Sequence, residues 1–412
     1  MKLLVQKYGG TSIGSPERIR RVARRVVTAR RAGYDVVGVV SAMGHTTDEL
    51  LALAQQVTRD PQRRHPRELD MLLSAGERTA MALTAMAIRD LGEQAISLTG
   101  SQAAIITDEA HTGARIEEVR ATRVREELAA GRIVIVAGFQ GVSRAREVTT
   151  LGRGGSDTTA VALAVALHAE YCDIYTDVDG VFTADPRRVA GAVLVAAIGY
   201  DEMVELASAG AQVLHPRAVE IGARYGTPIR VRSSLRTDEH PGTVITRRTR
   251  SMEKLTLTGL ASRSGYARLV LRGLPATMTA TSRVLSAFAA GNVSVDLAGH
   301  ADSPDGRRQL QLTIAENDLE RAEDVAGRLL ESLGGEAMEV KTGLSRVTLV
   351  GSGMTGVPGV YARAFEALVA AEVEVYALST SAITITFVVP ADAEERTLQA
   401  LHAAFALAGE PE

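Results

Sequence analysis

Three glycines and one arginine, followed by a serine and an aspartate, form the stretch of this chain best suited to chemistry. They occupy residues 152–157, with the arginine at Arg153. Glycines let backbone N–H groups close on an anion, and the apolar run from Thr158 to Leu167 predicts a buried helix directly behind them. The planar guanidinium suits a carboxylate or a phosphate. A tight turn that carries a surface arginine is an equally open interpretation.

A lysine at the end of the first apolar stretch is the second candidate. Leu3–Gln6 predicts a strand, and Lys7 is followed by a tyrosine and two glycines. An ammonium in this place can reach phosphates that lie over the glycines. Asp35–Val40 predicts another strand, and the segment that follows it carries hydroxyl residues at Ser41, Thr46 and Thr47. Hydroxyl groups at a strand end suit a polar ligand.

Two further segments place charge where it is unusual. Glu77 lies among alanine and methionine within a helical pattern over 67–90. It is either exposed on the far face of that helix or pairs with a cation, such as the ammonium of a substrate. Residues 176–187 combine two acids, a hydroxyl, an aromatic ring and an arginine. This segment could hold a nucleotide or could be a capped hairpin.

Apolar strands that alternate with helical patterns position these residues. Strands are predicted at 3–6, 35–40, 133–138 and 171–175. This alternation predicts an α/β fold with a mainly parallel sheet sandwiched by helices. Sites in such sheets lie beyond the carboxyl ends of the strands. All the candidates except Glu77 fall at such ends, and we give this convergence more weight than any single motif.

Composition limits the class of protein. The chain has 412 residues, which predicts two or three domains, and a net charge of −3, which gives no global attraction for nucleic acid. The arginine-rich helix over 16–31 is either a solvated face or a phosphate-binding one, and the net charge favours the first. Cys172 is the only cysteine, so an internal disulfide is excluded and a reducing cytoplasm is expected. We expect no signal peptide, membrane span or zinc site.

The second half of the chain is a repeat. Arg268 and Arg346 begin similar strands 78 residues apart, and Val293 corresponds to Val373 at an offset of 80. Each unit reads strand–helix–strand–strand–helix, which predicts two ferredoxin-like βαββαβ modules, and a plain oligomerisation module is the other interpretation. The expected boundaries are a first domain at 1–247, a linker at 248–263 and modules at 264–340 and 345–412.

Taken together, these segments resemble the aspartate kinases of the amino-acid kinase family. The match covers nearly the whole chain in family order, most closely the short actinobacterial or Bacillus-like type, and the repeat corresponds to paired ACT domains. The matching motifs begin at Lys7, Ser41, Thr47, Ser74, Leu98, Thr150, Thr176 and Val231.

The resemblance implies ATP-dependent phosphorylation of the β-carboxylate of L-aspartate, the first step toward lysine, threonine and methionine. It assigns catalysis to Lys7 and Asp157, and substrate binding to Ser41, Thr47, Glu77, Arg153 and Ser156. Nucleotide contacts are assigned to Lys7, Tyr8, Gly9, Gly10, Thr176, Asp177, Phe182, Arg187, Gln212 and Val213. Mg²⁺ is expected on the phosphates of ATP, without a protein metal site.

Several positions depart from the family. Phe182 replaces a frequent tyrosine and Gln212 a frequent lysine, which predicts weaker ATP affinity. Leu274–Thr277 replaces an Asp-x-Pro-Gly turn, which predicts weak or absent feedback inhibition by lysine plus threonine. The resemblance also implies a homodimer through the ACT domains and a regulatory subunit initiated internally at Met252. A non-catalytic amino-acid sensor and a kinase for another carboxylate are the alternatives.

Overall fold

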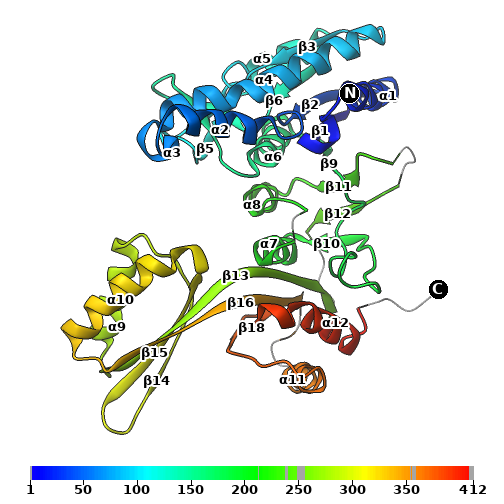
Figure 1. Ribbon diagram of the computed structural model, residues 1–412. Helices are drawn as coiled ribbons and strands as arrows, with labels where there is room; N and C mark the ends of the chain where they lie inside the picture. Colours follow the sequence, from blue (N-terminus) through cyan, green and yellow to red (C-terminus); the bar gives the residue numbers. More distant parts are fainter. Residues whose placement is uncertain are drawn as a thin grey trace. The chain divides into compact units, whose positions relative to one another are not determined.

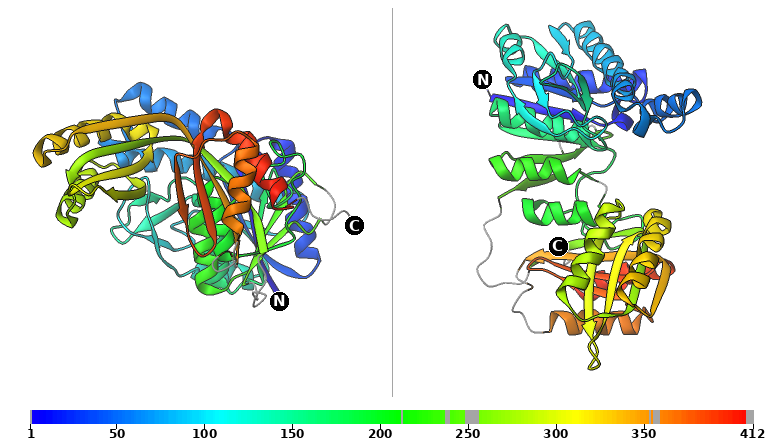
Figure 2. Two further views of the ribbon diagram at one scale, coloured as in Figure 1. Left: turned by 90° about the horizontal axis from the view of Figure 1, so that it is seen from below. Right: turned by 90° about the vertical axis from the view of Figure 1, so that its left-hand side faces the viewer.

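The computed structural model describes residues 2–211, 213–236, 240–247, 256–352, 354 and 359–407 (Figure 1, Figure 2). The chain forms two compact units. The first contains Met1–Phe182 and Leu194–Ser251, and the second contains Thr183–Val193 and Met252–Glu412. No helix in the described ranges is both long and apolar enough to cross a membrane.

An eight-stranded sheet forms the centre of the first unit, in the order β10-β12-β11-β9-β1-β2-β6-β3. All neighbours in it are parallel except β11 and β12, so the predicted mainly parallel sheet is confirmed. Lys7 is paired with Val39 and Ile174, which brings the carboxyl ends of three strands together. The strands are β1 (Lys2–Tyr8), β2 (Tyr34–Val40), β3 (Ala95–Leu98), β6 (Ile133–Ala137), β9 (Tyr171–Thr176), β10 (Ala197–Gly199), β11 (Ile229–Ser233) and β12 (Thr243–Thr246).

Helices cover both faces of this sheet. Side chains of α1 and α4 share one apolar core with β1, β2 and β6. Helix α6 is buried almost all round and packs against β1, β2 and β9. The helices of this unit are α1 (Pro16–Arg31), α2 (Thr46–Val57), α3 (Pro61–Arg64), α4 (Pro66–Asp90), α5 (Thr122–Ala129), α6 (Gly155–Leu167), α7 (Tyr200–Ala209) and α8 (Pro216–Tyr225), with a 3-10 turn η1 (Gly10–Ile13).

The arginine-rich helix α1 has a serine cap at its start and ion pairs at its end. Ser15 caps it, because its hydroxyl accepts the backbone N–H of Arg18 at 3.3 Å. Arg30 pairs with Asp35 at 2.5 Å and Arg31 bonds Glu93 at 3.2 Å. These partners neutralise the two arginines at the end of the helix, which agrees with a solvated face.

A small four-stranded sheet, β5-β4-β7-β8, was not predicted, because strands of three or four residues carry too little periodicity. The hydroxyls of Thr107 and Thr149 join its strands in the interior, 2.6 Å apart. Strand β8 leads directly into the glycine loop at 152–155. The strands are β4 (Ile105–Thr107), β5 (Ile116–Val119), β7 (Gln140–Ser143) and β8 (Val148–Thr150).

The second unit is one six-stranded antiparallel sheet, β14-β15-β13-β16-β18-β17. Two long strands, β13 and β16, run through both modules, and each module has the predicted ferredoxin-like order. The elements are β13 (Thr256–Pro275), α9 (Met278–Ala290), β14 (Val295–Asp302), β15 (Arg307–Ala315), η2 (Glu316–Asp318), α10 (Leu319–Leu333), β16 (Ala337–Ser352), α11 (Val360–Ala370), β17 (Ala377–Thr380), β18 (Thr384–Pro390), η3 (Ala391–Ala393) and α12 (Glu394–Ala404).

The structure differs from the expected boundaries in two places. Residues 256–263, expected as linker, are the first part of β13, because they pair with β16 and complete the sheet of the second module. Residues 183–193, expected within the first domain, belong to the second unit. Ala184 and Val189 are buried in its core, and Arg188 forms an ion pair with Glu394. Met252, the predicted internal start, lies outside the described residues.

Candidate active site

A buried ion pair lies at the carboxyl end of β1. The Nζ atom of Lys7 is 2.6 Å from Oδ1 of Asp157, and the two side chains are only 12% and 11% exposed. Asp157 stands in the first turn of α6. A Cβ added at Gly9 would lie 3.4 Å from the Lys7 ammonium, so this glycine lies directly beside the cation. The pair therefore fixes a cation where an incoming anion can approach over the glycines.

Glu77 on α4 is buried, with an exposure of 2%, so the exposed interpretation is wrong. Its Oε1 accepts the backbone N–H of Ala42 at 3.0 Å, whereas its Oε2 has no hydrogen-bond partner in the described chain. Burial raises the pKa of this carboxyl to about 7. An unpaired carboxylate oxygen held in the interior suits the ammonium of an amino acid.

The glycine loop is shaped by backbone conformation and close packing. Gly154 has a φ of +71°, and a Cβ there would lie 2.3 Å from the ring of His215, so only glycine fits. The backbone N–H of His215 donates to Oδ2 of Asp157 at 3.4 Å. Ser156 is buried beside Asp157 in the first turn of α6. Arg153 is exposed and has no side-chain bond within the described ranges, which leaves its guanidinium free for a ligand.

The predicted residues Tyr8, Ser41 and Thr47 lie at or after the ends of the first two strands, and the side chain of Tyr8 is placed differently from the other two. The backbone N–H of Ser41 donates to the carbonyl of Tyr8 at 3.1 Å, and Thr47 is half-buried in the first turn of α2. Tyr8, however, is fully buried and its ring stacks on Tyr175, with 4.9 Å between the centroids. Its side chain is part of the core, so only its backbone could face a nucleotide.

The predicted nucleotide residues are divided between the two units. Thr176 and Asp177 follow directly at the end of β9, and their side chains are hydrogen-bonded at 3.1 Å. Phe182 and Val213 are half-buried in the first unit. Arg187 belongs to the second unit, where it bonds both oxygens of Asp185. Gln212 lies outside the described residues. Gly10, the remaining predicted residue, accepts the backbone N–H of Gly44 with its carbonyl.

Sequence reasoning missed the residues that support the glycine loop. Asp70 is fully buried on α4 and bonds Thr150 at the end of β8. Arg217, in the first turn of α8, bonds the carbonyl of Leu151 at 2.8 Å. One signal was available, since Asp70 precedes Glu77 by seven residues and therefore shares its helix face.

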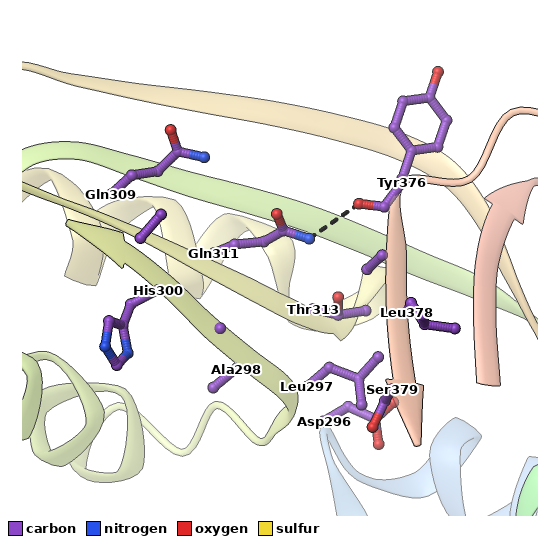
Figure 3. Close-up of a pocket in the computed structure, with 13 residues that line it drawn as sticks. Asp296, Leu297, Ala298, His300, Gln309, Gln311, Thr313, Tyr376, Leu378 and Ser379 are labelled. Carbon is purple, nitrogen blue, oxygen red and sulfur yellow. Dashed lines mark hydrogen bonds between the residues drawn. The ribbon is translucent and has the colours of Figure 1, made fainter. Parts of the chain in front are cut away.

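A separate hollow in the second unit is lined by β14, β15 and residues 376–379 (Figure 3). Most of its polar side chains are neutral, including Gln309 and Gln311. The amide of Gln311 donates to the carbonyl of Tyr376 at 3.1 Å. None of the side chains predicted for catalysis or substrate binding lines this hollow.

The chain is similar to known proteins over its whole length. It matches the amino acid kinase family over residues 2–233 and the ACT domain over residues 347–405. An aspartokinase of Bacillus sp. (strain MGA3) is 46% identical over 409 residues, covering 99% of this chain and 98% of the relative. An aspartokinase of Mycolicibacterium smegmatis is 46% identical over 417 residues, covering 100% and 98%.

Solved structures agree with this similarity. The structure of E. coli aspartokinase III in complex with aspartate and ADP has a TM-score of 0.81 and 27% identity, and the match covers 98% of this chain and 100% of that one. The same enzyme in complex with lysine and aspartate has a TM-score of 0.74 at 28% identity, covering 97% and 99%. By sequence and by fold, the chain belongs to the amino acid kinase family and, within it, to the aspartokinases.

Proposed function

We propose that the protein transfers the γ-phosphoryl group of ATP to the β-carboxylate of L-aspartate, giving ADP and 4-phospho-L-aspartate. The observation that carries this proposal is the unpaired Oε2 of the buried Glu77, which suits the α-ammonium of an amino acid. The aspartokinase relatives, and the aspartate and ADP bound to E. coli aspartokinase III, support the same substrates. The product is the first intermediate toward the amino acids derived from aspartate.

The reaction needs positioning and charge neutralisation more than a general base. A carboxylate is already ionised near neutral pH, so its oxygen can attack the γ-phosphorus directly. A bond forms between that oxygen and phosphorus, while the bond from phosphorus to the bridging oxygen of ADP breaks. Lys7, oriented by Asp157, neutralises the phosphates, and Arg153 clamps the carboxylate that does not react. Ser41, Thr47 and Ser156 add hydrogen bonds to the acceptor.

The nucleotide approaches from the ends of β1 and β9. The backbone of residues 8–10 and the polar pair Thr176 and Asp177 are the groups that would contact it. Mg²⁺ would enter on the phosphates, which supply most of its ligands together with water. Gln212 stands where relatives often carry a lysine, and we expect it to weaken ATP binding. Gln212→Lys should therefore lower the KM for ATP, and an unchanged KM would refute a role of Gln212 in ATP affinity.

A hydroxylamine trap tests the proposed reaction. The purified chain, with ATP, Mg²⁺ and L-aspartate, should form a hydroxamate and release an equal amount of ADP. A panel with glutamate, N-acetylglutamate and carbamate separates aspartate from other carboxylate acceptors. Glu77→Gln is the matched negative control. Either ADP release without hydroxamate or no turnover with aspartate would contradict the proposal, and no turnover with any acceptor would favour a non-catalytic sensor.

We propose that the second unit forms a homodimer through its open strand edges. β14 and β17 end the six-stranded sheet and have no further strand partner in the described chain. Each module also exposes apolar residues on a helix: Met278 and Leu285 on α9, and Tyr361, Phe365 and Val369 on α11. Such apolar surface is typical of an interface. Val369→Glu should shift the mass in solution to that of a monomer, whereas an unchanged dimer would exclude this surface.

We propose that feedback inhibition by lysine plus threonine is weak, because the turn before α9 satisfies its own polar groups. Thr277 caps α9 by accepting the N–H of Ala280 at 3.2 Å. Arg308 bonds Asp302 at 2.6 Å and also the carbonyl of Thr277. Within the described part of this turn, few polar groups are left for an amino-acid effector. Strong inhibition at sub-millimolar lysine plus threonine would overturn this proposal.

Two smaller expectations accompany the function. The cytoplasm is the expected location, because ATP is available there and the buried Cys172 needs no oxidising environment. The regulatory subunit initiated at Met252 would be seen as a smaller C-terminal product of the intact coding region, and its absence would count against it.

A further inference from the structure

Asp70 is a buried charge that the reaction described above does not use. Its side chain on α4 has no exposed surface. It accepts hydrogen bonds from the hydroxyl of Thr150 at 2.5 Å, from Nδ1 of His111 at 2.7 Å and from the backbone N–H of Thr112 at 3.1 and 3.2 Å. A carboxylate is retained in the interior only with such partners, so all three donor groups are fixed by it.

These donors belong to two segments that lie against the glycine loop. His111 and Thr112 are in the turn between β4 and β5, and Thr150 ends β8, three residues before Arg153. Thr112 has a φ of +64°, which is unfavourable for a β-branched residue and requires support from its surroundings. Its carbonyl lies 3.1 Å from the position of a Cβ at Gly152, so the turn packs directly on the loop.

Arg217 joins the same two segments from the other side. Its Nη1 donates to the carbonyl of Leu151 at 2.8 Å, and its Nη2 donates to the carbonyl of Ala114 at 2.9 Å. The backbone N–H of Ala114 in turn donates to the carbonyl of Thr150 at 2.9 Å. Both guanidinium bonds go to backbone atoms, so Arg217 fixes the path of the main chain as it enters the loop.

Helix α4 connects this support to the other end of the acceptor site. Asp70, Ser74 and Glu77 are all buried and lie on one helix face, because they are spaced at i, i+4 and i+7. Seven residues of helix span about 10 Å along the axis. A packed helix is stiff, so α4 sets the separation between Glu77 and the segments that carry Arg153.

We propose that Asp70 and Arg217 are positioning residues for the acceptor. They hold the loop that carries Arg153 at a distance from Glu77 that α4 fixes. This distance selects aspartate over glutamate, its longer homologue. The inference rests on the proposed roles of Glu77 and Arg153. Asp70 and Arg217 act through the backbone of 150–155 and not on the reacting atoms.

Steady-state kinetics of Asp70→Asn and Arg217→Met, with aspartate and ATP varied in turn, test this. Each variant should raise the KM for aspartate about tenfold or more, from the loss of charge-assisted bonds, and leave the KM for ATP within about twofold. The preference for aspartate over glutamate in kcat/KM should fall, because the loop no longer stands at a fixed distance. Arg217→Lys, which cannot bond both carbonyls in the same way, should restore only part of the affinity.

Asp173→Asn is the matched control. Asp173 is also a buried carboxylate, bonded to Arg230 at 2.6 Å, but it has no bond to the loop or its supporting turn. The Asp173→Asn variant should be less stable than the parent chain, but its KM for aspartate should not rise relative to its KM for ATP. Equal increases in both KM values, or an unchanged preference between aspartate and glutamate, would overturn the inference.

Hydrogen exchange makes the result independent of turnover. Amides of residues 111–114 and 150–155 should exchange faster in Asp70→Asn and Arg217→Met than in the parent chain, and those in Asp173→Asn should not. If the parent chain phosphorylates aspartate but the variants match it in kinetics and exchange, only this inference fails. If the parent chain does not use aspartate, the proposed function fails, and exchange still decides whether Asp70 and Arg217 hold the loop.

Discussion

Helix α4 buries two carboxylates two turns apart, and their surroundings are opposite. Asp70 is 0% exposed and accepts from three donor groups, whereas Glu77 is 2% exposed, accepts one N–H and leaves Oε2 unpaired. A buried carboxylate without full bonding is costly, so it persists where a ligand supplies the missing partner. Under the proposed function, the satisfied carboxylate supports the site and the unsatisfied one receives the ammonium of the substrate.

The largest effect that follows from this difference is on catalysis with Glu77→Gln. An amide keeps the shape but cannot neutralise the ammonium of aspartate. We expect kcat/KM for aspartate to fall about 100- to 1000-fold, equivalent to roughly 3–4 kcal/mol for one partner of a buried charged pair. The KM for ATP should stay within about twofold. A loss of less than about tenfold would place the ammonium elsewhere.

The free energy of unfolding should rise in Glu77→Gln and fall in Asp70→Asn. At pH 8 the unfolded state ionises Glu77 readily, while burial disfavours the charge in the fold. A pKa raised from 4.5 to about 7 corresponds to about 3 kcal/mol of lost stability. Glu77→Gln should recover about 1–2 kcal/mol of it, after the cost of an unpaired amide. Asp70→Asn should instead lower the free energy of unfolding by about 2–3 kcal/mol.

Chemical denaturation at pH 8 measures both changes. The sign for Glu77 follows from linkage: between about pH 4.5 and 7 the folded state holds a proton that the unfolded state has lost, so the contribution of Glu77 to stability falls as pH rises through that window. The gain in Glu77→Gln should therefore shrink toward pH 5. If Glu77→Gln and Asp70→Asn both lowered the free energy of unfolding at pH 8, the proposed difference between an unsatisfied and a satisfied carboxylate would be wrong.

The pH dependence of acceptor binding gives a smaller effect. Because the pKa of Glu77 is raised to about 7, much of the free enzyme is protonated there below neutrality. The KM for aspartate should fall about tenfold between pH 6 and pH 8, as the carboxylate that receives the ammonium forms. In Glu77→Gln the same profile should be flat, and a parallel slope in both proteins would assign the ionisation to another group.

The sequence was sufficient for the catalytic sheet and the two ferredoxin-like modules, because long apolar strands and repeats are strong periodic signals. It could not show that residues 256–263 complete the second module, since pairing between β13 and β16 joins segments about 90 residues apart. Nor could it show that residues 183–193 leave the first unit, because Ala184 and Val189 are typical of any short apolar segment.

At the candidate site, types of residue were easier to predict than their surroundings. Lys7, Arg153 and Glu77 were found from charge in unusual places. Burial decided between the two interpretations of Glu77, whereas the exposed Arg153 agrees with both of its interpretations. Tyr8 was assigned to the nucleotide as a residue, and its ring stacks in the core on Tyr175, because alternate residues of a strand point to opposite faces. Asp70 was overlooked because its donors come from distant turns, which no local pattern connects.

The smallest expected effect separates the support of the loop from general stability. Thr150→Val removes one of the three donor groups of Asp70 and keeps the shape of the side chain. Thr149→Val removes an equally buried hydroxyl from the adjacent position, but that hydroxyl bonds Thr107 and not Asp70. Both variants should lose about 1 kcal/mol of stability. Only Thr150→Val should raise the KM for aspartate, by about threefold, since a single neutral donor to a charged group is lost. Equal KM values in the two variants would show that Asp70 stabilises the fold without setting the position of Arg153.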